Sequence, residues 1–174
     1  MVADSLGKGL VIVFIGFNPS PASALAGHPY AHRSNRFYRI LYESGLTPIL
    51  HVPEEHREML TLYGYGFTNI VARTTRRADE LSADEFATGR RTVLAKLKRF
   101  RPHIACFVGK GVYRPYSGRS AFPYGFQTQV AQTDSCEFVG PATSGLVRMP
   151  LAEQVVIYRV LAQAAASVRD NTER

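Results

Sequence analysis

The sequence has few cysteines, only Cys106 and Cys136 among its 174 residues. Two thiols are too few for an iron–sulfur cluster held by four cysteines. Both lie in apolar runs that indicate strands, so we expect reduced core residues rather than a disulfide. No apolar run reaches the roughly 18 residues of a transmembrane helix, and the first residues lack the charged and apolar regions of a signal peptide. We therefore expect a soluble cytoplasmic protein without a membrane partner.

The motifs of several enzyme classes are also missing. The five histidines show no ligand spacing such as HExxH, and no CxxC pair occurs, so we expect no metal site. The sequence has no GxGxxG, and Gly109-Lys110-Gly111 lacks the spacing of a phosphate-binding loop. Ser144 lacks the flanking glycines of a nucleophile elbow. These absences favour a site that binds and orients its substrate without a metal or another cofactor.

Acidic residues are scarce: 14 Asp and Glu stand against 21 Lys and Arg, which gives a net charge of +7. No acid occurs at positions 5–42, 59–78 or 138–152. A surface built from these gaps would suit a polyanion, although a solvated basic face would have the same composition. The arginines that such a surface would present are Arg33, Arg36, Arg73, Arg76, Arg77 and Arg148.

Strands and helices are predicted to alternate along the chain. Continuous apolar runs are typical of parallel strands that are covered on both faces. We expect strands at residues 10–16, 67–71, 103–109, 127–132 and 136–139. We expect helices at 34–44, 53–62, 83–99, 111–116 and from Pro150 onward, with a frayed tail at 169–174. Ser34 can cap the first helix, and Ser82 with Glu85 forms a capping box at the third. This order predicts one three-layer α/β/α domain over 1–174, with its core at about 8–165 and a mainly parallel central sheet.

Two loop residues stand out as candidates for chemistry. Asn18 follows the first strand, and sites in open α/β sheets lie at the carboxyl ends of strands. Its amide could hold a water molecule or bond a pyrimidine edge. Alternatively, Asn18 is only a turn residue that bonds its own backbone. Tyr30 could stack on a planar base, or be an ordinary half-buried loop tyrosine.

Six short motifs occur in the order found in one enzyme family. Over residues 8–165 the chain resembles the mismatch-specific uracil/thymine DNA glycosylases, which include the bacterial double-stranded uracil-DNA glycosylases. The motifs are Gly16-Phe17-Asn18-Pro19-Ser20, Ser34-Asn35-Arg36-Phe37-Tyr38, Gly66-Phe67-Thr68-Asn69-Ile70-Val71, Gly89-Arg90-Arg91, Val108-Gly109-Lys110 and Thr143-Ser144-Gly145-Leu146.

The resemblance implies a monofunctional hydrolase of base-excision repair with a uracil-DNA glycosylase-like fold. Such an enzyme flips uracil, or in some members thymine, from a mispair with guanine in duplex DNA. It then hydrolyses the N-glycosidic bond and leaves an abasic site. The resemblance also implies a monomer without metal or cofactor, which associates with the nucleoid when bound to DNA.

The resemblance assigns roles to individual residues. Asn18 would hold the attacking water, and Asn69 would assist it. Leu146 would be a wedge that fills the gap left by the flipped base, with backbone groups of Gly145 and Val147 facing the widowed guanine. The residues that would bind the pyrimidine are Phe17, Ser20, Ser23, Tyr30 and Ser144. Those that would contact DNA phosphates are Arg73, Arg76, Lys110 and Arg148.

Departures from the family pattern bear on specificity. Ala142-Thr143-Ser144-Gly145-Leu146 stands where bacterial members usually have Asn-Pro-Ser-Gly-Leu, and Asn69 stands where some have lysine. Ser23 near the 5-position of the base would hinder a methyl group, so we favour uracil over thymine. Three alternatives stay open: a catalytically silent mismatch-binding domain, a small-molecule nucleotide-binding protein, and a Leu146 that is simply buried.

Overall fold

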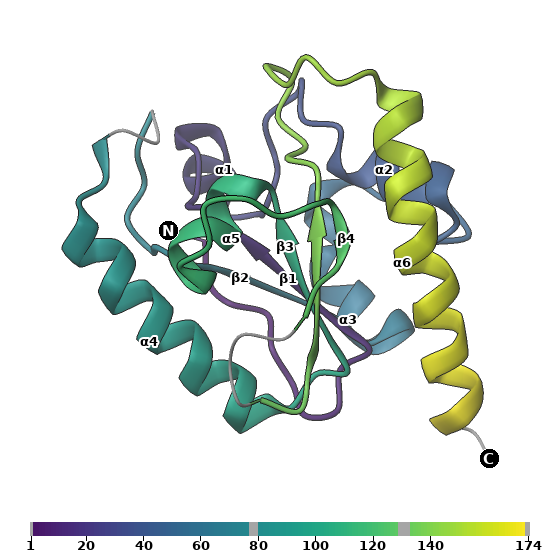
Figure 1. The fold of residues 1–174 in the computed structure, drawn as a ribbon. Helices are drawn as coiled ribbons and strands as arrows, with labels where there is room; N and C mark the ends of the chain where they lie inside the picture. The colour runs from purple at the N-terminus through teal and green to yellow at the C-terminus, as the bar shows by residue number, and fades with distance from the viewer. Residues whose placement is uncertain (1, 77–79, 129–132, 173–174) are drawn as a thin grey trace.

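The computed structural model describes residues 2–76, 80–128 and 133–172. Its strands are β1 (Ile12–Gly16), β2 (Tyr65–Asn69), β3 (Ile104–Val108), β4 (Gly125–Phe126) and β5 (Cys136–Gly140). Its helices are α1 (Pro21–Ala26), α2 (Phe37–Ser44), the 3-10 helix η1 (Pro53–Arg57), α3 (Glu58–Tyr63), α4 (Ala83–Phe100), α5 (Lys110–Ser117) and α6 (Leu151–Thr172). Figure 1 shows their arrangement along the chain.

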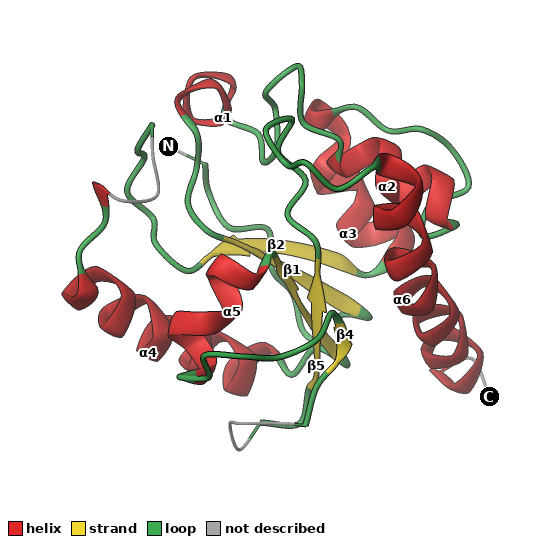
Figure 2. Cartoon of the chain, turned by 45° about the horizontal axis from the view of Figure 1, so that its top comes forward, coloured by secondary structure: helices red, strands yellow, loops and turns green. Residues whose placement is uncertain are grey.

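The five strands form one sheet in the order β2-β1-β3-β5-β4. All neighbouring pairs are parallel except β4 and β5, which are antiparallel. Figure 2 shows α4 and α5 on one side of the sheet and α2, α3 and α6 on the other. The predicted three-layer α/β fold with a mainly parallel sheet is therefore confirmed.

Alternate side chains of β1 enter two separate cores. Ile12 and Phe14 pack in the core under α2 and α6, whereas Val13 and Ile15 pack in the core under α4 and α5. A strand that is covered on both faces must be apolar at every position, because neither face meets water. This requirement explains why the first and third strands were visible in the sequence as unbroken apolar runs.

Helix starts follow their capping side chains. At α4 the predicted capping box is confirmed: Glu85 N donates to Ser82 Oγ (3.2 Å) and Ser82 N donates to Glu85 Oε2 (2.9 Å). The predicted cap at Ser34 is wrong. Asn35 Oδ1 instead accepts from Phe37 N (3.0 Å), so α2 begins at Phe37. The Ser34 hydroxyl bonds to the Nδ1 atom of His32 (2.8 Å).

Other differences from the sequence predictions are local. Cys106 is buried, and burial raises the pKa of its thiol well above the usual value, but Cys136 is exposed rather than a core residue. Both are free thiols. Residues 127 and 128 of the predicted fourth strand lie outside β4, and residues 129–132 lie outside the described part of the chain. Helix α6 continues to Thr172, where a frayed tail from 169 was expected.

The described residues contain neither a membrane-spanning helix nor a cluster of metal ligands. None of the described helices is long and apolar enough to cross a membrane. Within residues 2–76, 80–128 and 133–172, no group of three or more His, Cys, Asp or Glu side chains is placed to hold a metal ion.

Candidate active site

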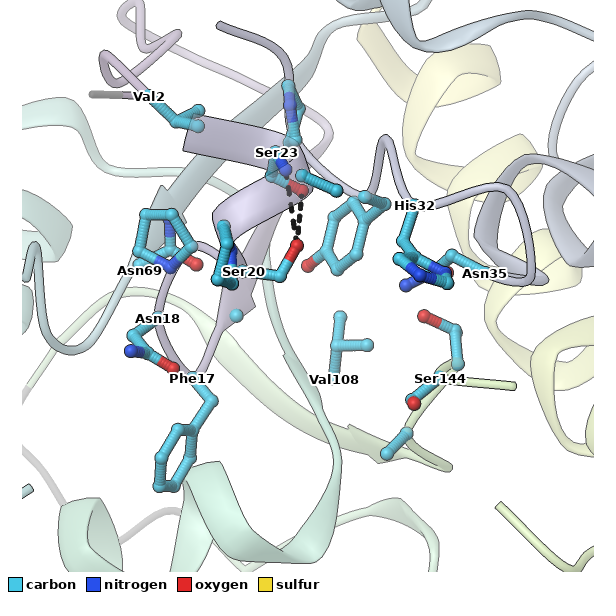
Figure 3. A pocket seen from close by; sticks show the side chains of 18 of the residues that line it. Val2, Phe17, Asn18, Ser20, Ser23, His32, Asn35, Asn69, Val108 and Ser144 are labelled. Atoms are coloured by element: carbon cyan, nitrogen blue, oxygen red, sulfur yellow. Dashed lines mark hydrogen bonds between the residues drawn. The ribbon is translucent and has the colours of Figure 1, made fainter. Parts of the chain in front are cut away.

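A cavity of about 650 Å³ opens at the carboxyl ends of the parallel strands. This is the edge of the sheet at which ligands bind in open α/β folds. Four segments that are far apart in the sequence meet there, and Figure 3 shows side chains from several of them. They are residues 16–23 at the end of β1, the 29–35 segment before α2, Asn69 at the end of β2, and residues 142–146 after β5.

The amide of Asn18 is held in one orientation. Its Nδ2 atom donates to the Arg73 carbonyl oxygen (2.8 Å) and to Thr75 Oγ1 (2.7 Å). Both amide protons are thus used, and no donor from the described residues meets the opposite atom, Oδ1. Figure 3 shows Asn18 at the wall of the pocket, with its oxygen on the pocket side. The interpretation of Asn18 as a turn residue that bonds its own backbone is therefore wrong, because its partners lie on the loop after β2.

The loop that holds Asn18 is itself tied to α4. Arg73 donates from Nε and Nη2 to the two carboxylate oxygens of Glu85 (2.7 and 3.1 Å), and from Nη2 to the Glu80 carbonyl (2.8 Å). The Arg73 hydrogen bonds, and then the Ser82 N–H, lower the pKa of Glu85 to about 2. The Arg73 guanidinium, expected on a DNA phosphate, is thus placed in an ion pair beside the site.

Asn69 and Tyr30 converge above Gly16. Gly16 and Asn69 are paired in the register of β1 and β2. A Cβ atom at position 16 would collide with Asn69 Oδ1 and lie 3.1 Å from the Tyr30 hydroxyl. Only glycine leaves room for both polar groups here, so the structure brings Asn69 and Tyr30 together on the pocket floor.

The ring of Tyr30 has a fixed position. It stacks on Phe37 with 3.9 Å between centroids and 12° between planes, and burial raises the pKa of its hydroxyl. Its backbone has a φ of 57°, a left-handed conformation that is uncommon outside glycine. Tyr30 therefore packs against Phe37 and also borders the pocket, which is where a ring could contact a planar ligand.

Ser20 and Ser23 connect helix α1 to the segment that carries Tyr30. Ser20 is the N-cap of α1, and its oxygen accepts from Ser23 N (3.2 Å). The Ser23 oxygen lies 3.1 Å from Ser20 Oγ and accepts from Ala31 N (3.1 Å). Both serines line the pocket, as Figure 3 shows. We did not predict α1, although a cap followed by Pro21 at the first helical position is a known start signal.

Phe17 and Ser144 face the pocket from opposite loops. The Phe17 ring packs edge-on against Phe86 of α4 at 5.2 Å. Its carbonyl accepts from Val71 N (3.0 Å), which leaves its N–H as the backbone group for a pyrimidine edge. Ser144 Oγ accepts from Leu146 N (3.3 Å).

Leu146 projects from the pocket rim with 93% of its surface exposed. It lies in a tight turn, in which Val147 N donates to the Ser144 carbonyl (3.0 Å). A fully exposed leucine is not explained by core packing, so the alternative of a buried residue is wrong.

The remaining predicted phosphate contacts occupy different places in the structure. Arg76 lines the pocket, and Arg148 is exposed two residues after Leu146. Lys110 begins α5, and its Nζ lies 4.5 Å from the Tyr124 ring centroid. Arg77 lies outside the described residues.

Sequence reasoning missed three contributors to the site: Thr75, Glu85 and Val2. Thr75 lies in the acid-free stretch at positions 59–78, but nothing local showed that it would meet Asn18. Glu85 was recognised only as a helix cap. Val2 lines the pocket because the first residues add to the sheet edge through the paired hydrogen bonds of Ser5 and Phe67 (2.9 and 2.8 Å).

The sequence of the chain matches a known enzyme superfamily. The sequence model of the uracil DNA glycosylase superfamily matches residues 5–162 of this chain. The matched region contains all five strands and every pocket segment described above except Val2.

Proposed function

Because the chain belongs to the uracil DNA glycosylase superfamily, whose members remove uracil from DNA in base-excision repair, we propose that its substrate is uracil mispaired with guanine in duplex DNA. The observation that carries this proposal is the fixed Asn18 amide, with Oδ1 available at the pocket wall. An amide oxygen accepts a hydrogen bond and so can hold a water molecule.

The reaction is a hydrolysis at C1′ of the deoxyribose. The C1′–N1 bond breaks, and its electron pair leaves with the pyrimidine as an anion. The water held by Asn18 adds to the oxocarbenium-like sugar and then loses a proton. Donors placed in advance near the pyrimidine oxygens stabilise the developing charge, and we assign this role to the Phe17 N–H and to the Asn69 amide.

The pocket has no acidic side chain among its described lining residues. Among these described residues no carboxylate is therefore placed to remove a proton from the water, and an amide has no basic site near neutral pH. We expect a slow enzyme, in which orientation of the water and stabilisation of the leaving base supply most of the rate.

In this proposal, Leu146 is the reason why the enzyme prefers uracil in duplex DNA. We assign it as the wedge that enters the base stack when uracil leaves, since an exposed apolar side chain gains by losing its contact with water. Flipping costs least for a mispaired base. Because the Val147 N–H is bonded to Ser144, we assign the guanine contact to the carbonyl groups of Gly145 and Val147.

Uracil is preferred over thymine in this proposal. Ser23 is 4% exposed, and its oxygen is held by Ser20 and Ala31. A side chain fixed in this way cannot move aside for a 5-methyl group. Phosphate contacts fall to Arg76, Arg148 and Lys110, whereas Arg73 is the least suited because Glu85 already binds it.

The test is single-turnover incubation with duplexes that carry U or T opposite G, and with the uracil strand alone, followed by alkaline cleavage of abasic sites. We expect excision from the G:U duplex. Asn18→Ala should slow it about a hundredfold or more, as for loss of one positioned proton-transfer or water-binding group, while Asn171→Ala in α6 should change nothing. Wild-type protein that binds this duplex without forming abasic sites would instead identify a silent mismatch-binding domain.

A further inference from the structure

The segment that carries Leu146 joins β5 to α6, and we name residues 141–150 the wedge loop. We propose that Arg36 and Gln154 hold the wedge loop in place and so position Leu146 for opening the duplex. This inference rests on the proposed function, because it deepens the role of the same wedge. Neither residue touches the pyrimidine, so both are positioning residues.

Arg36 contacts the wedge loop on both sides of its turn. Its backbone N–H donates to the Thr143 carbonyl (2.8 Å), before Leu146. Its Nη1 atom donates to the Met149 carbonyl (3.0 Å), after Leu146. The sequence placed Arg36 among the arginines of a basic surface, but in the structure its guanidinium is partly buried against backbone.

Gln154 of α6 makes the remaining side-chain contacts that hold the wedge loop. Its side chain is fully buried, and its Nε2 atom donates to the Ala142 carbonyl (2.8 Å). Its Oε1 atom accepts from Arg36 Nη1 (3.3 Å). The buried Gln154 side chain and the partly buried Arg36 side chain therefore hold the loop at Ala142 and Met149, while the Arg36 backbone holds Thr143.

The tip of the wedge loop also rests on the segment before Arg36. A Cβ atom at Gly145 would lie 2.7 Å from Ser34 Cβ and 2.8 Å from the Ser34 carbonyl. These backbones are as close as glycine allows, so the tip cannot move further toward residues 32–36. The loop is thus held at both ends and supported at its tip.

This arrangement matters because Leu146 itself is almost fully exposed. An exposed side chain has few protein contacts to fix it, so its position depends on the backbone that carries it. A loose loop would have to be ordered at each base-opening event, and that ordering costs conformational entropy. A loop that is already held avoids the cost.

The test measures base opening directly. A duplex carries a G:U pair with 2-aminopurine next to the uracil, whose fluorescence rises when the stack opens. We compare Arg36→Met and Gln154→Leu with Leu146→Ala at saturating protein. Arg39→Met is the matched control, since Arg39 is exposed on α2 and pairs with Glu43 instead. Circular dichroism confirms that each variant is folded.

We expect Arg36→Met and Gln154→Leu to lower the opening equilibrium about three- to tenfold, the effect of one lost hydrogen bond. Leu146→Ala should lower it as well, and Arg39→Met should not. Arg36→Lys should recover part of the signal, because an ammonium group can still donate to the Met149 carbonyl. The slope of log affinity against log salt should be the same for Arg36→Met and wild type.

Full fluorescence in folded Arg36→Met and Gln154→Leu would overturn the inference, and so would normal opening by Leu146→Ala. A salt slope that falls by about 0.9 in Arg36→Met would do the same, because it would identify a phosphate contact. Failure of the proposed function has a different signature: wild-type protein would leave no abasic sites in the G:U duplex.

Discussion

At the scale of single residues, the site depends on which way one amide faces. Asn18 could present either its nitrogen or its oxygen to the pocket, and the acceptors at Arg73 and Thr75 select the oxygen. The acceptor at Arg73 is a backbone carbonyl, which a side-chain substitution leaves in place. The acceptor at Thr75 is a side-chain hydroxyl, which a substitution can remove.

Thr75→Val keeps the shape of the side chain and removes the acceptor. We expect the single-turnover rate on G:U duplex to fall about three- to tenfold, as for one lost hydrogen bond, because the amide can then rotate. Duplex affinity should not change. Thr74→Val is the matched control, and an equal loss of rate in that variant would contradict the assignment.

The sequence predicted some of these residues and not others for a physical reason. Asn18 and Tyr30 were identified because residue type and position next to a strand or turn are local properties, whereas Leu146 was identified through the family resemblance. The pairing of Asn18 with Thr75, or of Arg73 with Glu85, joins residues that are far apart in the chain. Such pairs are set by packing, which one sequence does not reveal.

At the scale of elements, α4 sets the loop that holds Asn18. Gly89 lies where α4 crosses Ile70, the residue after Asn69. A Cβ atom at position 89 would collide with the Ile70 carbonyl oxygen and lie 2.9 Å from its carbon. The backbone of α4 at Gly89 therefore packs directly against the backbone that follows β2.

Glycine to alanine within a helix normally stabilises a protein by about 0.5–1 kcal/mol. At Gly89 we expect the opposite sign, a loss of about 1–3 kcal/mol, because the added methyl overpacks against backbone. Gly111 in α5 is the matched control, since its added Cβ would meet only Phe17 Cε2, at 3.9 Å. Urea unfolding of both variants checks the prediction, and a stabilised Gly89→Ala would refute it.

The ion pair between Arg73 and Glu85 contributes to the free energy of unfolding, and the size of this contribution depends on pH. The pKa of Glu85 is lowered from 4.5 to about 2 in the folded protein. A lowered pKa means that the contribution is complete above pH 4.5 and is lost as pH falls toward 2. Unfolding curves of wild type and Glu85→Gln should therefore differ at pH 6 and converge near pH 2. A constant difference across this range would contradict the assignment.

Most elements could be predicted because their signals are local: apolar runs for β1 and β3, and a capping box for α4. The errors occurred where local patterns did not decide between neighbouring residues. Asn35 rather than Ser34 bonds the start of α2, since Ser34 is held by His32 and supports Gly145. Cys136 lies at the exposed start of β5, so an apolar run did not imply burial of its first residue.

At the scale of the whole molecule, the net charge of +7 favours association with DNA. Three arginines of the predicted basic surface differ in what they contact in the structure. Arg36 and Arg73 bind protein groups, whereas Arg148 is exposed beside the wedge. Only an exposed arginine such as Arg148 should contact a DNA phosphate and release counterions on binding.

We expect duplex affinity to fall linearly with salt on a log–log plot. Arg148→Gln should make that slope shallower by about 0.9, the contribution of one phosphate contact. Arg73→Gln should leave the slope nearly unchanged, although it should slow excision by loosening the loop at Asn18. Fluorescence anisotropy at several salt concentrations measures both slopes, and equal slopes for Arg148→Gln and wild type would count against the phosphate contact.

Helix α6 has a further consequence for how the molecule is made. Gln154 near its start holds Ala142, and its buried face packs in the core under α2. During synthesis this helix is the last described element to leave the ribosome, after all the strands. Until it docks, the pocket segments exist but the wedge loop lacks the Gln154 attachment at Ala142. Under the proposed function, a chain in which α6 has not yet docked should therefore open the duplex less well than the folded protein.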